Sequence, residues 1–510
     1  MIRREFLELL RRLEGEFPVT TWKVRGIHVW PLVRLSLYSA TFRSGSPAHS
    51  LSAGWRRSGI NVVRGLGSWA RARIGDRAAS RGPGEQADAI FLGGSIGRRP
   101  LLEGKRYDVR AGPYVDLLGR LGARALVWEA SPFGDYNVPR YTPSYFVQPR
   151  LMALRAAAQV LPLGPDAPTL DRYDRFAAAV RDAGLGFAHA DVTRIRRDML
   201  YIRLLADTFA GWLRRSGARV GFVAGTGPQE QAFCLACRES GVTSVEVQHG
   251  VQGDLHPSYG SWFAVPEEGW ETRARVFWSW DAESAAAINR WAAGTAQRHL
   301  AIVGGDPWRE MWTDGGGELA RRVDERIRER MRVDRGDRHI LVTLSSQGDV
   351  VPPEVVEAIR ASPENWRYWF RLHPVNQAER QGAVRRILDP LGVDPQLTEF
   401  ATEAPLHALL GHMDCHLSVS LSTVIIEAAA FGVPSVAIGR EAPEFYRSEL
   451  STGLLAVATT GPELIEAVRR QLLRGRSAPA QEGPRSLETM RRLLQGELPL
   501  AELASPFAPV

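Results

Sequence analysis

The sequence predicts an α/β protein with two Rossmann-like domains, each built around a parallel β-sheet. Three observations lead to this prediction. Short apolar runs alternate with helical patterns over residues 88–304, and the same alternation returns over residues 339–473. A Gly-Gly-Asp-Pro stretch at residues 304–307 separates the two sets. Several apolar runs end in Gly, Ser or His, and in a parallel sheet such strand ends meet at the edge where ligands bind.

Composition places the protein among soluble globular chains with more than one domain. It has 510 residues, of which 44% are hydrophobic and 24% are charged. The net charge of +7 comes from Arg spread along the chain, which favours anionic substrates or an anionic membrane surface, and no nucleic-acid-binding motif is present. Three cysteines cannot form a disulfide framework, so we expect a cytoplasmic location.

Residues 1–85 are expected to form an amphipathic, helical N-terminal region. Its first helix carries an apolar stripe flanked by arginines. The stripe comprises Ile2, Phe6, Leu9, Leu10 and Leu13. This stripe either lies on anionic lipid at the inner face of the cytoplasmic membrane or packs on the protein itself. Residues 26–40 are apolar but contain Pro31 and Arg34, so they are not expected to span a membrane. Residues 44–84, rich in Ser, Gly and Arg, predict loop or loosely packed helix.

Residues 86–298 form the predicted first domain. Its expected strands are residues 88–92, 124–129, 218–224, 242–247 and 276–280, with a further strand at 301–304. Its expected helices are residues 114–121, 229–240 and 283–292. Helical patterns at residues 171–183 and 193–215 predict a helical insertion within this domain.

Two loops of the first domain carry candidate site residues. Gly94 and Ser95 follow the first strand, where glycine permits close backbone approach to a ligand. The strand at 242–247 runs into a Gly-rich loop containing Gln248, His249 and Gly250, and His249 is our candidate general base because imidazole exchanges protons near neutral pH. Asp254, further along this loop, is the alternative base. A histidine held by the backbone at a turn is the non-catalytic interpretation.

Residues 299–480 form the predicted second domain. Its expected strands are residues 339–344, 368–372, 397–400, 415–420, 433–439 and 454–458. Its expected helices are residues 318–332, 353–361, 378–388, 422–431 and 463–473. Residues 481–510 form a C-terminal tail with one helical pattern at 486–494.

Candidate anion-binding residues follow three strands of the second domain. A histidine or hydroxyl group at such a strand end can hold a phosphate, and a helix that begins there adds its free N–H groups. Glu427 shares the helix face of Thr423 at i, i+4 and can reach a sugar hydroxyl. Ser422 as an ordinary helix cap is the alternative interpretation. The predicted donor-site residues are Ser345, Ser346, Arg371, His373, Pro374, Ser420, Ser422, Thr423 and Glu427.

Together, the Gln-His-Gly loop, the His-Pro pair and the Ser-x-Ser-Thr turn before Glu-Ala-x-x-x-Gly-x-Pro resemble the GT-B fold glycosyltransferases of bacterial surface polysaccharides. The resemblance covers about residues 88–475 and is strongest to enzymes with cytidine-activated donors. These are capsule Kdo transferases, bacterial sialyl- and polysialyltransferases, and teichoic-acid glycerophosphotransferases. It implies two Rossmann-like domains that face a central cleft.

The resemblance also implies roles for individual residues. His373, Ser420, Ser422 and Thr423 would hold the donor phosphate, Glu427 would meet the ribose, and His249 or Asp254 would be the base of an inverting reaction. No Asp-x-Asp motif is present, so we expect a metal-independent reaction without a cofactor. Ser435 stands eight residues after Glu427, where retaining relatives carry a second Glu, which favours inversion.

We therefore expect a glycosyltransferase of capsule or lipopolysaccharide biosynthesis that moves a CMP-linked sugar, of Kdo or sialic acid type, to a glycan or lipid-linked glycan acceptor. Gln248, Gly250, Gly94 and Ser95 would line the acceptor side. Two alternatives remain: a nucleotide-sugar 2-epimerase of the same fold, and a non-catalytic subunit of a polysaccharide assembly complex.

Overall fold

A computed structural model describes residues 3–42, 83–94, 98–102, 104–130, 139–164, 169–313, 317–331, 336–345, 350–373, 377–439, 442–478 and 486–497. These residues belong to two compact units, each of which is described by itself. Unit 1 comprises Met1–Ser95, Arg110–Asp306 and Gly483–Val510, and unit 2 comprises Ile96–Val109 and Pro307–Glu482. The predicted α/β class with two Rossmann-like domains is confirmed, because each unit is built on a parallel sheet.

Unit 1 contains a seven-stranded parallel sheet in the order β11-β10-β9-β8-β3-β6-β7. The strands are β3 (Ala89–Gly93), β6 (Ala125–Glu129), β7 (Ser144–Phe146), β8 (Val220–Val223), β9 (Thr243–Val247), β10 (Val276–Ser279) and β11 (Leu300–Val303). Alternate residues of β3 belong to two separate hydrophobic clusters, Ile90 and Leu92 to one and Ala89 and Phe91 to the other. Both faces are thus covered, which explains the continuous apolar runs of these strands.

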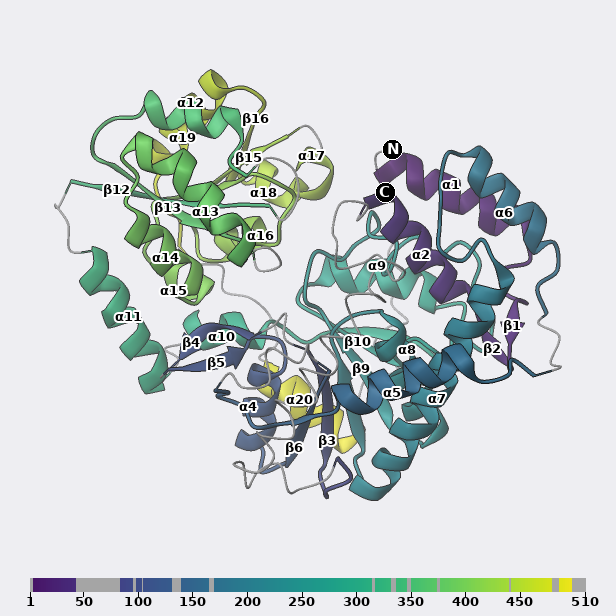
Figure 1. The fold of residues 1–510 in the computed structure, drawn as a ribbon. Coiled ribbons are helices and arrows are strands. Elements are labelled where there is room, and N and C mark those ends of the chain that lie inside the picture. The colour runs from purple at the N-terminus through teal and green to yellow at the C-terminus, as the bar shows by residue number, and fades with distance from the viewer. Residues whose placement is uncertain are drawn as a thin grey trace. The chain divides into compact units, whose positions relative to one another are not determined.

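Helices cover the two faces of this sheet. On one face lie α4 (Gly112–Arg120) and α20 (Ser486–Gln495), so the helix predicted at residues 486–494 packs on the first sheet (Figure 1). The helices α8 (Pro228–Glu239) and α9 (Ala282–Ala292) connect successive strands. The predicted helical insertion is present as α6 (Tyr173–Asp182) and α7 (Val192–Ser216), and a further helix that was not predicted, α5 (Gln148–Val160), precedes it.

The N-terminal segment packs on unit 1 through its apolar stripe. It consists of α1 (Arg3–Glu16), the short hairpin β1 (Lys23–Val24) and β2 (Ile27–His28), and α2 (Trp30–Phe42). Phe6, Leu9, Leu10 and Leu13 are all buried in the cluster that covers the sheet. Of the two alternatives for the stripe, this burial supports packing on the protein itself. In the described part of the chain no helix is long and apolar enough to cross a membrane.

Unit 2 contains a five-stranded parallel sheet in the order β13-β12-β14-β15-β16. The strands are β12 (Arg338–Thr343), β13 (Trp366–Arg371), β14 (Cys415–Ser418), β15 (Ser435–Ile438) and β16 (Leu455–Ala458). One face packs on α12 (Pro353–Arg360) and α19 (Gly461–Arg474), which lie side by side (Figure 1). The remaining helices are α10 (Pro307–Thr313), α11 (Gly317–Met331), α13 (Gln377–Leu388), α14 (Pro395–Glu403), α15 (Leu406–Leu410), α16 (Val424–Ala430), α17 (Ala442–Phe445) and α18 (Arg447–Ser451).

One predicted strand is wrong. Residues 397–400 lie in the helix α14 rather than in a strand. Asp394 caps this helix by accepting a hydrogen bond from Gln396 N at 2.8 Å, and Pro395 occupies its first turn. Thr398, Ala401 and Thr402 then fall on one buried face at helical spacing. Unit 2 also contains a hairpin that was not predicted, formed by β4 (Arg98–Leu102) and β5 (Lys105–Asp108).

Candidate functional site

Three candidate residues of unit 2 lie at the same level on adjacent strands. In the parallel register Thr343 of β12 pairs with Arg371 of β13 and with Ser418 of β14. Leu344 N donates to Arg371 O at 3.0 Å, and Val419 N donates to Thr343 O at 3.3 Å, so the pairing extends one residue past each strand. The next residues are Ser345, His373 and Ser420, and all three are half-buried. The carboxyl edge of unit 2 therefore gathers one imidazole and two hydroxyl side chains.

A half-buried charged group lies beside this edge. Arg371 Nη1 donates to the carbonyl oxygens of Ala401 and Ala404, the latter at 2.7 Å, at the C-terminal end of α14. Burial lowers the pKa of Arg371 to about 10, although the nearby Glu427 carboxylate acts in the opposite direction. Glu427 is itself buried. Arg371 thus stabilises the C-terminal end of α14 and lies in the electrostatic environment of Glu427.

His407, which the sequence analysis did not select, lies against Glu427. Its Nε2 is 3.4 Å from Glu427 Oε2, and neither ring nitrogen has a hydrogen-bond partner among the residues that the structure describes. Burial, together with the charges of Arg309 and Arg371, lowers the pKa of His407 to about 3, so its imidazole is neutral at pH 7. In the sequence, His407 could have been noticed as a polar residue within the apolar pattern Leu-His-Ala-Leu-Leu.

The hydroxyl-rich turn before α16 is held by one local hydrogen bond and by the hydroxyl group of Tyr446. The helix spans seven residues from Val424, so it is shorter than the predicted 422–431. Ser422 Oγ accepts a hydrogen bond from Val424 N at 3.3 Å, as a capping side chain does. The Tyr446 hydroxyl group accepts from Ser422 N at 2.7 Å and donates to Ser422 O at 3.0 Å. Thr423, the N-cap residue of α16, makes no side-chain cap hydrogen bond.

In unit 1 the residues after β9 form a fixed turn. Gln248 is buried, its Oε1 accepts from Trp280 N at 2.7 Å, and its Nε2 donates to Gly250 O at 3.1 Å. His249 is half-buried, with Nδ1 3.4 Å from Val247 O and its ring 6.4 Å from that of Tyr259. Gln248 therefore ties the turn to β10 and leaves His249 at the carboxyl edge of the sheet.

Gly94 and Asp254 are placed differently from His249. Gly94 follows β3, and β8 lies between β3 and β9, so the two strand ends are about 10 Å apart. Asp254 is exposed, and its Oδ2 pairs with Arg290 Nη2 of α9. Asp254 is therefore held at the surface by a cationic side chain, whereas His249 is half-buried at the carboxyl edge of the sheet.

A half-buried carboxyl group lies at the end of β8, between the strand ends that carry Gly94 and His249. Glu230 stands in the first turn of α8, after Gly225 and Gly227. A Cβ atom on Gly227 would lie 2.7 Å from Glu230 Oε2, so an alanine there would require the Glu230 carboxyl group to shift. Desolvation raises the pKa of Glu230, although backbone N–H groups and Arg110 partly oppose this shift. The sequence signal was the Gly-Thr-Gly-Pro turn, which the sequence analysis treated only as a connection.

A second carboxyl group lies in the strand that leads to His249. Glu246 of β9 is buried, and its Oε2 is 3.4 Å from Arg273 Nη2. Desolvation raises the pKa of Glu246, and the Arg273 charge opposes this shift. Arg273 also donates to Ser258 O at 2.9 Å. Residues within and beside the sheet therefore support the loop that carries His249.

Three predicted site residues, Ser95, Ser346 and Pro374, lie outside the described residues. Among the described residues, no group of three or more His, Cys, Asp or Glu side chains is placed to hold a metal ion.

Comparisons with known proteins give similarity at the level of structure. No protein-family model matches the chain, and no curated protein matches it significantly. The UDP-GlcNAc 2-epimerase of Methanocaldococcus jannaschii has 14% identity and a TM-score of 0.48, over 80% of this chain and 99% of that one. The UDP-GlcNAc 2-epimerase of Neisseria meningitidis, bound to UDP-GlcNAc, has 12% identity and a TM-score of 0.46, over 80% of this chain and 98% of that one. The wall teichoic acid polymerase TagF has 10% identity and a TM-score of 0.42, over 86% of this chain and 92% of that one.

Proposed function

We propose that this protein is a GT-B-type glycosyltransferase that transfers a sugar from a nucleotide-activated donor, of the CMP-linked Kdo or sialic acid class, to a glycan or lipid-linked glycan acceptor. Unit 2 binds the donor and unit 1 binds the acceptor. The reaction is inverting and requires no metal ion. Capsule or lipopolysaccharide biosynthesis in the cytoplasm is the proposed setting.

The observation that supports this function most directly is the row of Ser345, His373 and Ser420 on β12, β13 and β14. Open parallel sheets bind phosphorylated ligands at this edge because strand ends and helix starts converge there. An imidazole can donate to one phosphate oxygen while hydroxyl groups donate to others. Glu427, on the helix that follows β14, is the proposed acceptor for a ribose hydroxyl group.

His249 is the proposed general base. Its ring is half-buried at the carboxyl edge of the first sheet, on a turn that Gln248 fixes. In the proposed reaction, a ring nitrogen removes the proton of the acceptor hydroxyl group as that oxygen attacks the anomeric carbon. The bond to the donor phosphate then breaks, and His373 with the two serines stabilises the negative charge that develops on the leaving group.

A nucleotide-sugar 2-epimerase is the second candidate. The specific observation in its favour is a pair of carboxyl groups, Glu230 and Glu246, which interact electrostatically and whose pKa values are both raised by desolvation. Carboxyl groups with raised pKa values can exchange protons with a carbon acid. An epimerase acts on its nucleotide-sugar without any acceptor, which separates it from a transferase.

The test is an assay of purified full-length protein with CMP-, UDP- and GDP-linked sugars, with and without a glycan acceptor. The proposed function requires acceptor-dependent release of the nucleotide, and it requires that His249→Ala abolish this release while donor binding persists. Interconversion of UDP-sugars without an acceptor would indicate the epimerase instead. No turnover of any donor, despite binding, would indicate a non-catalytic subunit.

A further inference from the structure

The loop that carries His249 is unusually long for a connection inside a compact domain. It runs from Gln248 to Arg275, between β9 and β10, without a helix or strand of its own. Irregular loops of this length are mostly functional, and they need contacts from elsewhere to hold one conformation. In unit 1 several of those contacts come from the N-terminal helices α1 and α2.

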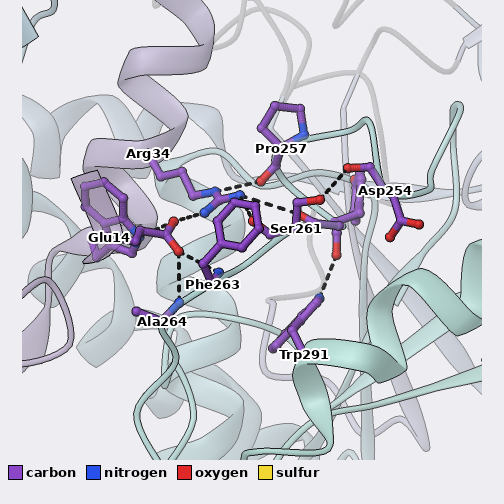
Figure 2. A network of polar contacts seen from close by, with 11 residues as sticks. Glu14, Arg34, Asp254, Pro257, Ser261, Phe263, Ala264 and Trp291 are labelled. Atoms are coloured by element: carbon purple, nitrogen blue, oxygen red, sulfur yellow. Dashed lines mark hydrogen bonds and ion pairs between the residues drawn. The ribbon is translucent and has the colours of Figure 1, made fainter. Parts of the chain in front are cut away.

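Glu14 of α1 binds the loop through its carboxylate. The side chain is buried, and its Oε2 accepts hydrogen bonds from Phe263 N at 2.7 Å and Ala264 N at 3.0 Å (Figure 2). Oε1 accepts from Trp30 Nε1 at 3.1 Å and pairs with Arg34. One side chain of α1 thus binds two consecutive backbone N–H groups of the loop. Hydrogen bonds to an ionised group are about twice as strong as neutral ones.

Arg34 of α2 binds the same loop through backbone oxygens. Nε donates to Pro257 O at 2.8 Å, and Nη2 donates to Ser261 O at 2.8 Å and to Gly260 O at 3.4 Å (Figure 2). The guanidinium also lies 4.4 Å from the ring centroid of Trp262. Its planar fork of five N–H donors is pre-organised to bind several acceptors in fixed directions, whereas a lysine ammonium is a compact point charge. Within residues 257–264, Glu14 therefore binds backbone N–H groups, and Arg34 binds backbone C=O groups.

These contacts extend toward the proposed base. Ser261 Oγ donates to Asp254 O at 2.8 Å, and a Cβ atom on Gly260 would lie only 2.4 Å from Gly253 O. Residues 260–261 are thus packed directly on residues 253–254. Trp291 Nε1 donates to Tyr259 O at 2.6 Å, and the Tyr259 ring lies in an edge contact with the His249 ring. A shift of residues 257–264 would therefore move the groups that surround His249.

We propose that Glu14 and Arg34 are positioning residues that set the conformation of the loop carrying His249. This inference rests on the proposed function, because it assigns that function's base to the loop being positioned. It also gives the N-terminal segment a role inside unit 1.

A second contact keeps the N-terminal segment attached when the first is removed. His28 of β2 donates from its backbone N to Glu271 Oε1 at 2.5 Å, and its Nδ1 lies 2.6 Å from Glu271 Oε2. The stripe of α1 also stays buried in the hydrophobic cluster. A substitution at Glu14 is therefore expected to release residues 257–264 locally, without detaching α1 and α2.

The test compares Glu14→Gln with Glu16→Gln in the full chain, because Glu16 is an exposed carboxylate two residues away on the same helix. We expect Glu14→Gln to increase amide hydrogen exchange of residues 249–264 at least tenfold. We also expect kcat to fall at least tenfold while the KM for the donor stays within twofold, since unit 2 is unchanged. Glu16→Gln should match the wild type in all three. Unchanged loop exchange and unchanged kcat in Glu14→Gln would overturn the inference.

A second variant covers the case in which Glu14→Gln does not fold. Glu14→Gln/Arg34→Met removes both charges together, which avoids leaving one buried charge unpaired. The same rise in loop exchange is expected. If the wild type transfers no sugar but the variants still accelerate loop exchange, the proposed function fails and the positioning of the loop stands. If the wild type is active and loop exchange does not change in the folded variant, the inference alone fails.

Discussion

The hydroxyl group of Tyr446 holds both backbone groups of Ser422, accepting from its N–H at 2.7 Å and donating to its C=O at 3.0 Å. Tyr446 is fully buried in a cluster with Ile425, Ala437 and Leu455. One residue of the helical segment after β15 thereby fixes the turn that carries the proposed phosphate-binding hydroxyl groups.

Removal of this hydroxyl group should weaken donor binding. Tyr446→Phe leaves the half-buried N–H and C=O groups of Ser422 without this partner, at a cost of about 1–3 kcal/mol. We expect at least a fivefold loss of nucleotide affinity, measured by calorimetry. Tyr368→Phe is the control, because it removes a buried hydroxyl group bound to Ser362 rather than to the turn. Equal losses in both variants would mean that Tyr446 acts only through general stability.

Substitution of Glu427 should reduce affinity for the nucleoside rather than for phosphate. Glu427→Gln keeps the shape of the side chain but removes the charge that lies near Arg371. A hydrogen bond to a charged group contributes about 1.5–3 kcal/mol, so the affinity for the nucleotide should fall roughly tenfold or more. Binding of inorganic pyrophosphate, measured in parallel, should change little. A loss of the same size for pyrophosphate would contradict the ribose role.

Stability should fall as the pH drops from about 6.5 to about 4, partly because of His299. This side chain is buried, accepts from Trp270 N at 2.9 Å and contacts Ala274 O at 2.7 Å. Burial lowers its pKa to about 4, so between about pH 4 and 6.5 the unfolded chain binds more protons than the folded one. The contribution of His299 is fully present above this window, and at most about 3 kcal/mol is lost below it. Urea unfolding at several pH values gives the free energy of unfolding as a function of pH, and this dependence should be weaker in His299→Gln. An identical pH dependence in the variant and the wild type would contradict this assignment.

Two glycines of unit 2 should respond in opposite directions to alanine. Gly432 has φ of +69°, and a Cβ atom there would lie 2.0 Å from Ser477 O, so Gly432→Ala should destabilise the unit by more than about 1 kcal/mol. Gly382 lies inside α13, and among the described residues only Arg386 Nη1 lies within 4 Å of an added Cβ, so Gly382→Ala should stabilise by about 0.5–1 kcal/mol. Denaturant titrations of both variants test the pair.

Much of the fold could be predicted from the sequence, because the strands of both sheets are buried on two faces and appear as continuous apolar runs bounded by turns. The predicted strand at 397–400 failed because Leu397 and Phe400 suit either structure, and Pro395 with Asp394 decides for a helix. The roles of Glu14 and Arg34 could not be predicted. Both lie more than 200 residues from the loop that they bind, and only the folded chain brings them together.

Glu230 and His407 illustrate the same limit for the candidate sites. Each stands in a helix whose sequence is otherwise unremarkable, and its altered pKa arises from burial by distant residues. By contrast, Ser345, His373 and Ser420 could be selected because each directly follows an apolar strand pattern.

The most direct test of the central claim is calorimetric titration of the full chain, and of His373→Ala, with CMP, CDP, UDP, GDP and ADP. His412→Gln serves as the matched control, because His412 precedes β14 at the opposite end of the strand and pairs with Asp324 at 2.5 Å. We predict that a cytidine nucleotide binds, that His373→Ala lowers this affinity at least tenfold, and that His412→Gln leaves it unchanged. Absence of binding by all five nucleotides, or equal affinity in wild type and His373→Ala, would contradict a donor site at the carboxyl edge of unit 2.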